Sequence, residues 1–270
     1  YGKGDSLGTY LSYSQEDKAW YALPAPIGSH SYPMVSRIDY FKKHAGIDLV
    51  DIFPADVGKR DKAKVDAWTY DVFMEAAKKL HAAGFPFGGA IAETSDGMDW
   101  LGPLLLSFGS QPMDREGNIT IESDGTLAGL EYLKELTQYM PKDIYGWDDA
   151  SNNRWIISGK GSAIQNPPSA WSVAKRTQPE NAAQMWHHDT PRGPAGHFRG
   201  ALFYNFILWD WCKEKKAAKE LLTFLLEKPQ QYKMLEVAQG YDMPQLKPMY
   251  DNPVCEKEGP PPGGIYNYVI

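Results

Sequence analysis

Apolar residues recur every three to four positions in several stretches of the chain, and this spacing predicts amphipathic helices. The clearest stretch is WTYDVFMEAAKKLHAAG, where Thr69 is expected to cap the helix and Gly84 to end it. Its buried stripe should comprise Val72, Phe73, Ala76, Ala77 and Leu80. The other predicted helices cover residues 100–108, 123–141, 153–158, 215–229 and 230–240, with one more beginning at Pro167 and Pro168.

Two of these helices carry further expectations. Leucines at 127, 130, 133 and 136 should form the buried face of the helix over residues 123–141, with Ser123 or Asp124 as its cap. The helix over residues 100–108 should end at Gly109, with Asp99 before its first residue. The leucine stripe therefore predicts that one face of the helix over residues 123–141 packs on a core.

Short apolar runs between the helices predict strands. They are WYALP, the start of PMVSRIDYF, SAIQN and ALFYNFIL, the last read as a buried strand; REGN predicts a hairpin turn, and residues 56–66 a surface loop. Strands that alternate with helices indicate an α/β protein, and the chain shows no internal repeat.

Composition excludes some function classes. The 270 residues are 43% hydrophobic and 23% charged, with a net charge of -6 and no clustered basic surface, so no nucleic-acid partner is expected. No apolar run approaches the roughly 20 residues of a membrane span. Cys212 and Cys255 fit no metal cluster, and the sequence leaves open whether they form a disulfide.

The sequence gives only weak evidence for catalytic residues. Asp148 and Asp149 are placed to act as the acid and base of a glycosidase, but adjacent carboxylates before a helix more often cap it. His187 and His188 point apart on a regular element, which disfavours a shared metal and suggests a solvated pair. We therefore predict no enzyme, no metal and no cofactor.

The order of motifs along residues 18–253 resembles the extracellular solute-binding proteins of ABC importers, in the sugar-binding family that includes maltose-binding protein. The motifs are WYALP with IDYFKKHAGID, DAWTYDVFMEAAKKL, WLGPLLLSFGSQPMDREGNITIES, NNRWIISGKGSAIQNPPSAW, PRGPAGHF, and KKAAKELLTFLLEKPQQ with GYDMPQLKPMYDNP. Each motif is loose alone, and the ordered set is more specific.

The resemblance implies a periplasmic binding protein-like fold with two α/β lobes, joined by crossing strands, that close on a solute in the cleft between them. It implies a remnant of the first lobe with a crossing strand over 1–26, the second lobe over 27–200, a crossing strand with first-lobe helices over 201–250, and a C-terminal loop segment over 251–270. Family members begin with a further strand and helix portion, so one lobe is expected to be incomplete.

A sugar contact is expected where the strand SAIQN meets the Asn-Pro-Pro turn. Open α/β folds bind ligands at the carboxyl ends of strands, so Trp171 is expected to cover a sugar face while Asn166 and Ser169 bond to its hydroxyls. Ser169 stands near where maltose-type proteins have a stacking aromatic, so maltose itself is not implied. The alternative is that Trp171 and Trp155 are core residues without contact to a ligand.

Four further residues are candidate contacts by the resemblance. Asp99 and Trp100 follow a loop that touches solute in the family, although Asp99 is equally placed to cap a helix. Tyr204 lies near a crossing strand and is more often a core residue at such a place, and His30 lies in the loop after the first crossing.

The resulting hypothesis is a monomeric periplasmic protein, or a membrane-tethered extracellular one in a Gram-positive source. It delivers a carbohydrate or related polyol to an ABC permease. The alternatives are a carbohydrate-active hydrolase that uses Asp148 and Asp149, and a truncated binding-protein fragment with no ligand function.

Overall fold

The computed structural model describes residues 12–14, 16–25, 32–239, 241–242 and 249. The chain divides into two compact units. Unit 1 comprises Tyr1–His30 and Leu202–Gly259, and unit 2 comprises Ser31–Ala201 and Pro260–Ile270. The predicted boundaries after residues 26 and 200 fall beside these division points, and the assignment of each unit to a lobe of the family stays a prediction.

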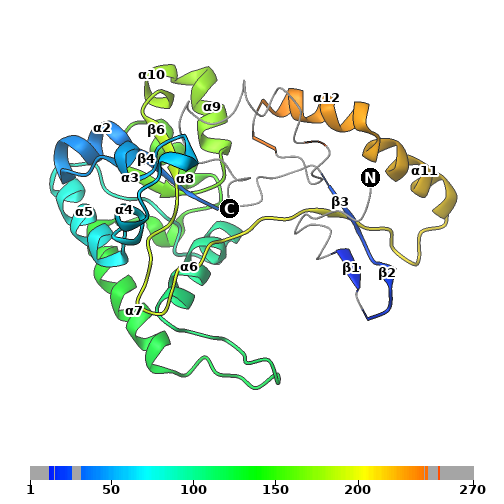
Figure 1. The fold of residues 1–270 in the computed structure, drawn as a ribbon, viewed down its shortest axis with the longest axis horizontal. Coiled ribbons are helices and arrows are strands. Elements are labelled where there is room, and N and C mark those ends of the chain that lie inside the picture. Colours follow the sequence, from blue (N-terminus) through cyan, green and yellow to red (C-terminus); the bar gives the residue numbers. More distant parts are fainter. Residues whose placement is uncertain (1–11, 15, 26–31, 240, 243–248, 250–270) are drawn as a thin grey trace. The chain divides into compact units, whose positions relative to one another are not determined.

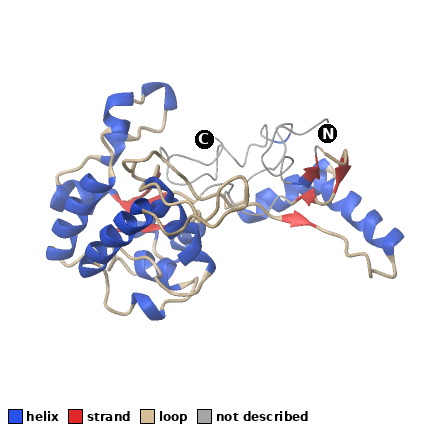
Figure 2. Cartoon of the chain, turned by 90° about the horizontal axis from the view of Figure 1, so that it is seen from below, coloured by secondary structure: helices blue, strands red, loops and turns tan. Residues whose placement is uncertain are grey.

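Unit 2 is built on a three-stranded antiparallel sheet in the order β5-β4-β6, with helices around it (Figures 1 and 2). Val35 lies at its centre, opposite Ile164 on one side and His187 on the other. The three strands are β4 (Met34–Arg37), β5 (Ala163–Gln165) and β6 (Met185–His188). All three are buried along their length, so helices must cover both faces of the sheet.

Helices make up most of the regular secondary structure described in unit 2. They are α2 (Ile38–Tyr40), α3 (Leu49–Ile52), α4 (Lys62–Asp66), α5 (Tyr70–Ala82), α6 (Ser95–Ser107), α7 (Asp124–Leu136), α8 (Ser151–Ile157), α9 (Ser169–Thr177) and α10 (Pro179–Ala182). Shorter turns are the π-helix η1 (Phe41–Ala45) and the 3-10 helices η2 (Val57–Lys59), η3 (Thr137–Tyr139) and η4 (Ile144–Gly146).

The two faces of the sheet are packed differently. One face packs against α8, α9 and α10 in an apolar cluster that includes Val35, Ile164 and Trp171. On the other face the ring of His188 stacks on Phe53 at 5.0 Å and meets Trp68 edge to face at 5.6 Å. This double burial fixes the register of the sheet, because a slip by one residue would exchange the two sets of side chains.

The expected solvation of the histidine pair is wrong. His187 and His188 do point apart, as predicted, but both are fully buried. His188 bonds through Nε2 to Ser36 Oγ at 2.8 Å, whereas neither ring nitrogen of His187 has a hydrogen-bond partner. Burial lowers the pKa of His187 to about 3 and of His188 to about 4. The pair is therefore neutral core material.

The observed helix caps agree in part with those predicted from the sequence. Thr69 accepts a hydrogen bond from Val72 N, and Ser123 from Thr126 N, as predicted. The helix predicted over residues 100–108 instead begins at Ser95, because Thr94 Oγ1 accepts from Gly97 N at 3.0 Å. Asp99 lies inside α6, so the alternative that it caps this helix is wrong.

Several expected faces and loops are also corrected. Leu127 and Leu130 are exposed although Leu136 is buried, because α7 packs on α6 through Gly129, which lies against Leu105. Val72 of α5 is 37% exposed. The expected loop over residues 56–66 contains η2 and α4, which remain largely exposed.

The described residues of unit 1 form short antiparallel strand pairs and two helices. Its elements are β1 (Tyr13–Ser14), β2 (Ala19–Trp20), β3 (Leu23–Pro24), β7 (Asn205–Phe206), α11 (Lys215–Leu226) and α12 (Lys228–Ala238). β1 pairs with β2, and β3 with β7. The long buried strand expected over ALFYNFIL is wrong, because only two residues are in a strand and Ile207 is 50% exposed.

Candidate functional site

A buried amide cluster lies where β5 ends and α9 begins, and we define it as Asn152, Asn153, Asn166 and Ser169. Asn166 Nδ2 donates to Pro167 O at 2.8 Å and to Ser169 Oγ at 2.9 Å, and its Oδ1 accepts from Asn152 Nδ2 at 3.0 Å. Asn153 Nδ2 donates to Ser169 Oγ at 3.1 Å. Side chains from α8 and α9 are thereby tied to the carboxyl end of a central strand.

The two outer members of this cluster are accessible. Asn153 and Ser169 are half-buried, whereas Asn152 and Asn166 are each 2% exposed. Asn153 Oδ1 is itself buried and has no hydrogen-bond partner. A buried amide oxygen of this kind costs stability unless something donates to it. The cluster therefore offers donors and acceptors to a polar ligand.

An acidic cluster, defined as Asp96, Asp99 and Asp149, adjoins the amide cluster. Asp96 Oδ2 accepts from Asn152 Nδ2 at 2.7 Å, which joins the two clusters directly. Asp149 Oδ1 accepts from the backbone N of Asp96 at 3.0 Å. The acids come from the first turns of α6 and from the residues before α8, two segments that the fold brings together.

Burial raises the pKa of Asp96 to about 6; the Tyr32 hydroxyl and then the Asn152 amide oppose the rise, and the carboxylates of Asp149 and Asp99 add to it. Burial, and then Asp149, also raises the pKa of Asp99. Tyr32 is 1% exposed, and burial followed by the Asp96 carboxylate holds its pKa far above the usual range. Its hydroxyl is close enough to Asp96 for the two groups to affect each other's ionisation, but it makes no hydrogen bond of normal geometry.

The structure corrects the expectation of open aromatic platforms. Trp100 is 3% exposed, donates through Nε1 to Ala90 O at 2.9 Å and meets Phe87 edge to face. Trp171 of α9 is 5% exposed and belongs to the apolar cluster between this helix and the sheet. Both indoles fill separate parts of the core of unit 2, so neither presents a free face to a sugar.

The remaining predicted contacts fall in different places. Asn166 and Ser169 are joined in the amide cluster, and half-buried Asp99 lies in the adjoining acidic cluster. Tyr204 is 47% exposed and belongs to unit 1, where its carbonyl accepts from Ala25 N at 2.9 Å. His30 lies outside the described residues.

The glycosidase alternative is not supported by the geometry. Asp148 accepts from Ser151 Oγ at 2.6 Å and from Arg154 at 2.8 Å, which fixes it at the start of α8. Asp149 is held against the first turn of α6. Neither carboxylate caps the helix that follows it, so the predicted role as caps is wrong. Asp148 accepts from Ala150 N just before α8, and Asp149 accepts from Asp96 N of α6.

Sequence reasoning missed Asp96, Asn152, Asn153 and Tyr32 as members of the site. The adjacent amides of Asn152 and Asn153 at the start of a helix were an available signal, because such residues favour caps and turns. Asp96 was not recognisable, since its position depends on where α6 begins. The contact of Tyr32 with the acids depends on tertiary structure alone.

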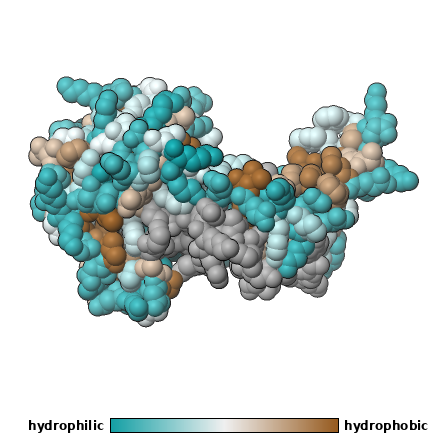
Figure 3. Space-filling view, turned by 90° about the horizontal axis from the view of Figure 1, so that it is seen from above, coloured by the Kyte–Doolittle hydropathy of each residue, from teal (hydrophilic) through white to brown (hydrophobic). Residues whose placement is uncertain are grey.

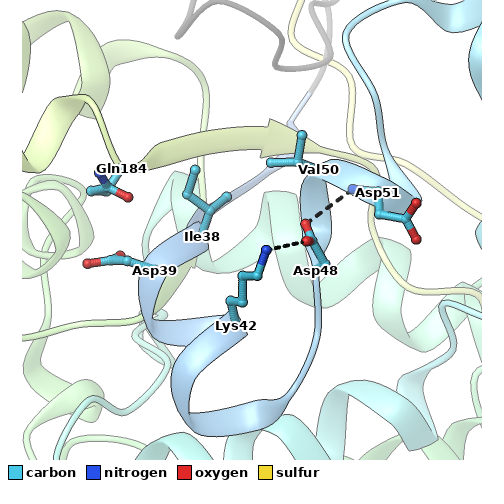
Figure 4. A pocket seen from close by; sticks show the side chains of 7 residues that line it. All are labelled: Ile38, Asp39, Lys42, Asp48, Val50, Asp51 and Gln184. Atoms are coloured by element: carbon cyan, nitrogen blue, oxygen red, sulfur yellow. Dashed lines mark hydrogen bonds and ion pairs between the residues drawn. The ribbon is translucent and has the colours of Figure 1, made fainter.

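A hollow of about 490 Å³ elsewhere in unit 2 does not form part of this site (Figure 4). It is lined by residues of α2, η1 and α3, including Lys42 and Asp48. Lys42 Nζ already pairs with Asp48 Oδ2 at 2.7 Å, and Asp48 caps α3 by accepting from Asp51 N. Lys42 and Asp48 are thus satisfied by one another, so this ion pair offers no unmet charge to a ligand.

Unit 1 carries a groove of about 470 Å³ between β2–β3 and α11, with Trp20, Trp209 and Leu222 in its lining. Apolar surface gathers on this unit (Figure 3), and the rings of Trp209 and Trp211 stack at 6.1 Å. Trp211 is 75% exposed.

Within the described ranges, no group of three or more His, Cys, Asp or Glu residues is arranged to hold a metal ion. The described helices are also too short or too polar for any of them to traverse a lipid bilayer. Cys212 is half-buried, and Cys255 lies outside the described residues.

The fold resembles solved binding proteins. Maltose-bound T. maritima MalE3 is 22% identical with a TM-score of 0.76, and the match covers 96% of this chain and 62% of that one. A sugar transporter from Arthrobacter chlorophenolicus A6 with bound laminaribiose is 15% identical with a TM-score of 0.71, covering 96% and 60%. The GacH receptor of Streptomyces glaucescens GLA.O is 16% identical with a TM-score of 0.69, covering 95% and 61%.

These matches confirm a periplasmic binding protein-like α/β fold, and the chain spans less than two thirds of the length of the three structures. A search of curated proteins finds no match. The family model described as bacterial extracellular solute-binding protein matches residues 3–259. The chain belongs to this family of bacterial extracellular solute-binding proteins, which confirms the predicted solute-binding family and a location outside the cytoplasm.

Proposed function

We propose that the chain is the solute-capturing component of an ABC importer, that it binds a carbohydrate or related polyol, and that the amide and acidic clusters of unit 2 contact this solute. The observation that carries the proposal is the union of the two clusters through Asn152, whose Nδ2 donates to both Asp96 and Asn166. Fixed amides and carboxylates at the carboxyl end of a strand suit a ligand rich in hydroxyls.

The comparisons support the carbohydrate class indirectly. MalE3 was solved with maltose and the Arthrobacter protein with laminaribiose. Delivery to a membrane permease and a monomeric state are part of the same proposal. Asp99, Asn166 and Ser169 remain proposed contacts from the sequence, and Asp96 and Asn153 join them on the geometry.

Calorimetric titration with a panel of mono- and disaccharides, amino acids and short peptides tests the proposal. We expect at least one carbohydrate to bind and Asn153→Ala to weaken it, because this change removes the Nδ2 donor to Ser169 and the unpartnered Oδ1. Asn118→Ala, in the exposed turn between α6 and α7, is the matched control and should bind normally. A response to amino acids or peptides alone would reject the carbohydrate class, and silence with an intact fold would favour a fragment without ligand function.

A further inference from the structure

The acidic cluster lacks any positive counter-charge among the described residues. No Lys, Arg or His of the described part forms an ion pair with Asp96, Asp99 or Asp149. Asp189, another acid of unit 2, has a side chain that is only 12% exposed, and it does have positive counter-charges. Asp189 accepts from Arg199 Nε at 2.7 Å and Nη2 at 2.6 Å, and His197 Nε2 lies 3.3 Å from it. The fold thus gives the buried Asp189 carboxylate counter-charges and leaves half-buried Asp96 and Asp99, with exposed Asp149 beside them, without any.

A second observation points to a missing ligand at the same place. The Tyr32 hydroxyl is buried and makes no hydrogen bond of normal geometry, although it lies near the Asp96 carboxylate, and all three carboxylates raise its pKa. A buried hydroxyl without such a bond costs free energy that a polar ligand would recover. Tyr32 reaches the cluster from the residue before β4, and its backbone N is fixed to Gly200 O at 3.0 Å. Its position is therefore set by the fold.

The chemistry of these groups selects the ligand. Ionised carboxylates only accept hydrogen bonds, and an ammonium group offers three donors with a full positive charge. Burial disfavours carboxylates without a counter-charge, and a nearby cation restores the ionised form. A neutral hydroxyl supplies one donor and leaves the repulsion between the acids in place. An amine therefore complements this cluster better than a hydroxyl does.

We propose that the solute is an amino-substituted carbohydrate or polyol whose protonated amine binds the acidic cluster of Asp96, Asp99 and Asp149. This inference rests on the proposed function, because the amide cluster is taken to bind the hydroxyls of the same molecule. When two sugars differ only by an amine in place of a hydroxyl, the carboxylates make the protein bind the charged amino sugar more tightly.

A pH dependence follows from the same geometry. The groups that face Asp96 are Asp99 on its own helix, Asp149 before α8 and Tyr32 before β4. Below about pH 6 the Asp96 carboxyl gains a proton, and one negative charge of the cluster is lost. The affinity for the amine should therefore rise between pH 5 and pH 7, and the affinity for the hydroxyl counterpart should stay nearly constant.

The test compares sugars that differ at one position. Titrations at pH 7 use glucosamine, glucose and N-acetylglucosamine, and the corresponding galactose and mannose sets, against the complete 270-residue chain. In the best-binding set we expect the amine to bind about tenfold more tightly than its hydroxyl or acetamide counterpart, a difference of about 1.4 kcal/mol. Asp99→Asn should abolish most of this preference, with a several-fold larger loss of affinity for the amine than for the hydroxyl sugar, because it removes a charge and keeps the shape. Glu131→Gln, on the exposed surface of α7, is the control and should preserve the preference.

Three outcomes separate the two proposals. Equal or tighter binding of the hydroxyl sugars would overturn the amine inference and leave the proposed function standing. An equal loss for both sugars in Asp99→Asn would also overturn it, since the charge would then set no preference. If spermidine binds in a manner that Asp99→Asn removes while no carbohydrate of any charge binds, the cluster takes cations and the proposed carbohydrate function fails.

Discussion

Helices α5 in unit 2 and α11 in unit 1 are of nearly equal length and carry similar apolar stripes, yet their packing is opposite. α5 buries six side chains, among them Phe73 and Leu80, whereas α11 buries none. Leu221 and Phe224 of α11 are 56% and 49% exposed. An apolar stripe therefore predicts that a segment is helical, and burial depends on whether the same unit supplies a surface to cover it.

The largest expected effect comes from truncating equivalent leucines of the two helices. Leu80→Ala should lower the free energy of unfolding of unit 2 by about 2–5 kcal/mol, because it leaves a cavity in a packed core. Leu221→Ala should change the stability of unit 1 by less than about 0.5 kcal/mol. Urea unfolding of the two variants measures both. Similar losses would show that α11 is covered in solution and would break the comparison.

Acid should lower the stability of unit 2 more than that of unit 1, because unit 2 holds every described histidine. The lowered pKa values of His187 and His188 keep both rings neutral in the folded state, while the unfolded chain takes up protons below about pH 6.5. The free energy of unfolding should therefore fall as the pH drops from about 6.5 toward 4. Protonation of Asp96, whose folded pKa of about 6 is raised, offsets part of the fall in the same range.

A variant isolates the contribution of one ring. His187→Leu should make the pH dependence of stability shallower by about 1.4 kcal/mol per pH unit, because the unfolded chain then binds one proton fewer. Urea unfolding at several pH values between 4.5 and 7 measures the slope. An unchanged slope would mean that His187 is accessible to protons in the folded protein.

The smallest effect concerns the helix caps. Thr69→Ala should destabilise unit 2 by about 1 kcal/mol, because the hydrogen bond to Val72 N is lost. Glu214, at the corresponding position of α11, makes no side-chain cap, so Glu214→Ala should be nearly neutral. Thermal unfolding of both variants checks the difference, and a larger loss for Glu214→Ala would contradict it.

Local signals in the sequence predicted much of the fold. Thr69 and Ser123 were identified as caps because a hydroxyl before an apolar stripe is a local feature. Gly84 and Gly109 end α5 and α6 with φ values of 89° and 96°, which glycine tolerates. The start of α6 was missed because Thr94 and the polar first turn carry no apolar periodicity.

The site was less predictable because its members depend on tertiary contacts. The resemblance and the Asn-Pro-Pro turn led to Asn166 and Ser169, which the structure joins. Trp100 was misjudged because an indole can satisfy its N–H on a backbone carbonyl and enter the core. No local pattern indicates that Tyr32 and Asp96, 64 positions apart in the numbering, lie together.

The central claim is that solute binds to the amide and acidic clusters of unit 2. Hydrogen exchange of the chain, with and without the carbohydrate that binds most tightly in the titrations, tests it directly. The account predicts slower exchange in residues 94–100, 148–153 and 165–170, the segments that carry the two clusters. Unchanged exchange in these segments, with protection around Trp20 and Trp209 instead, would contradict it.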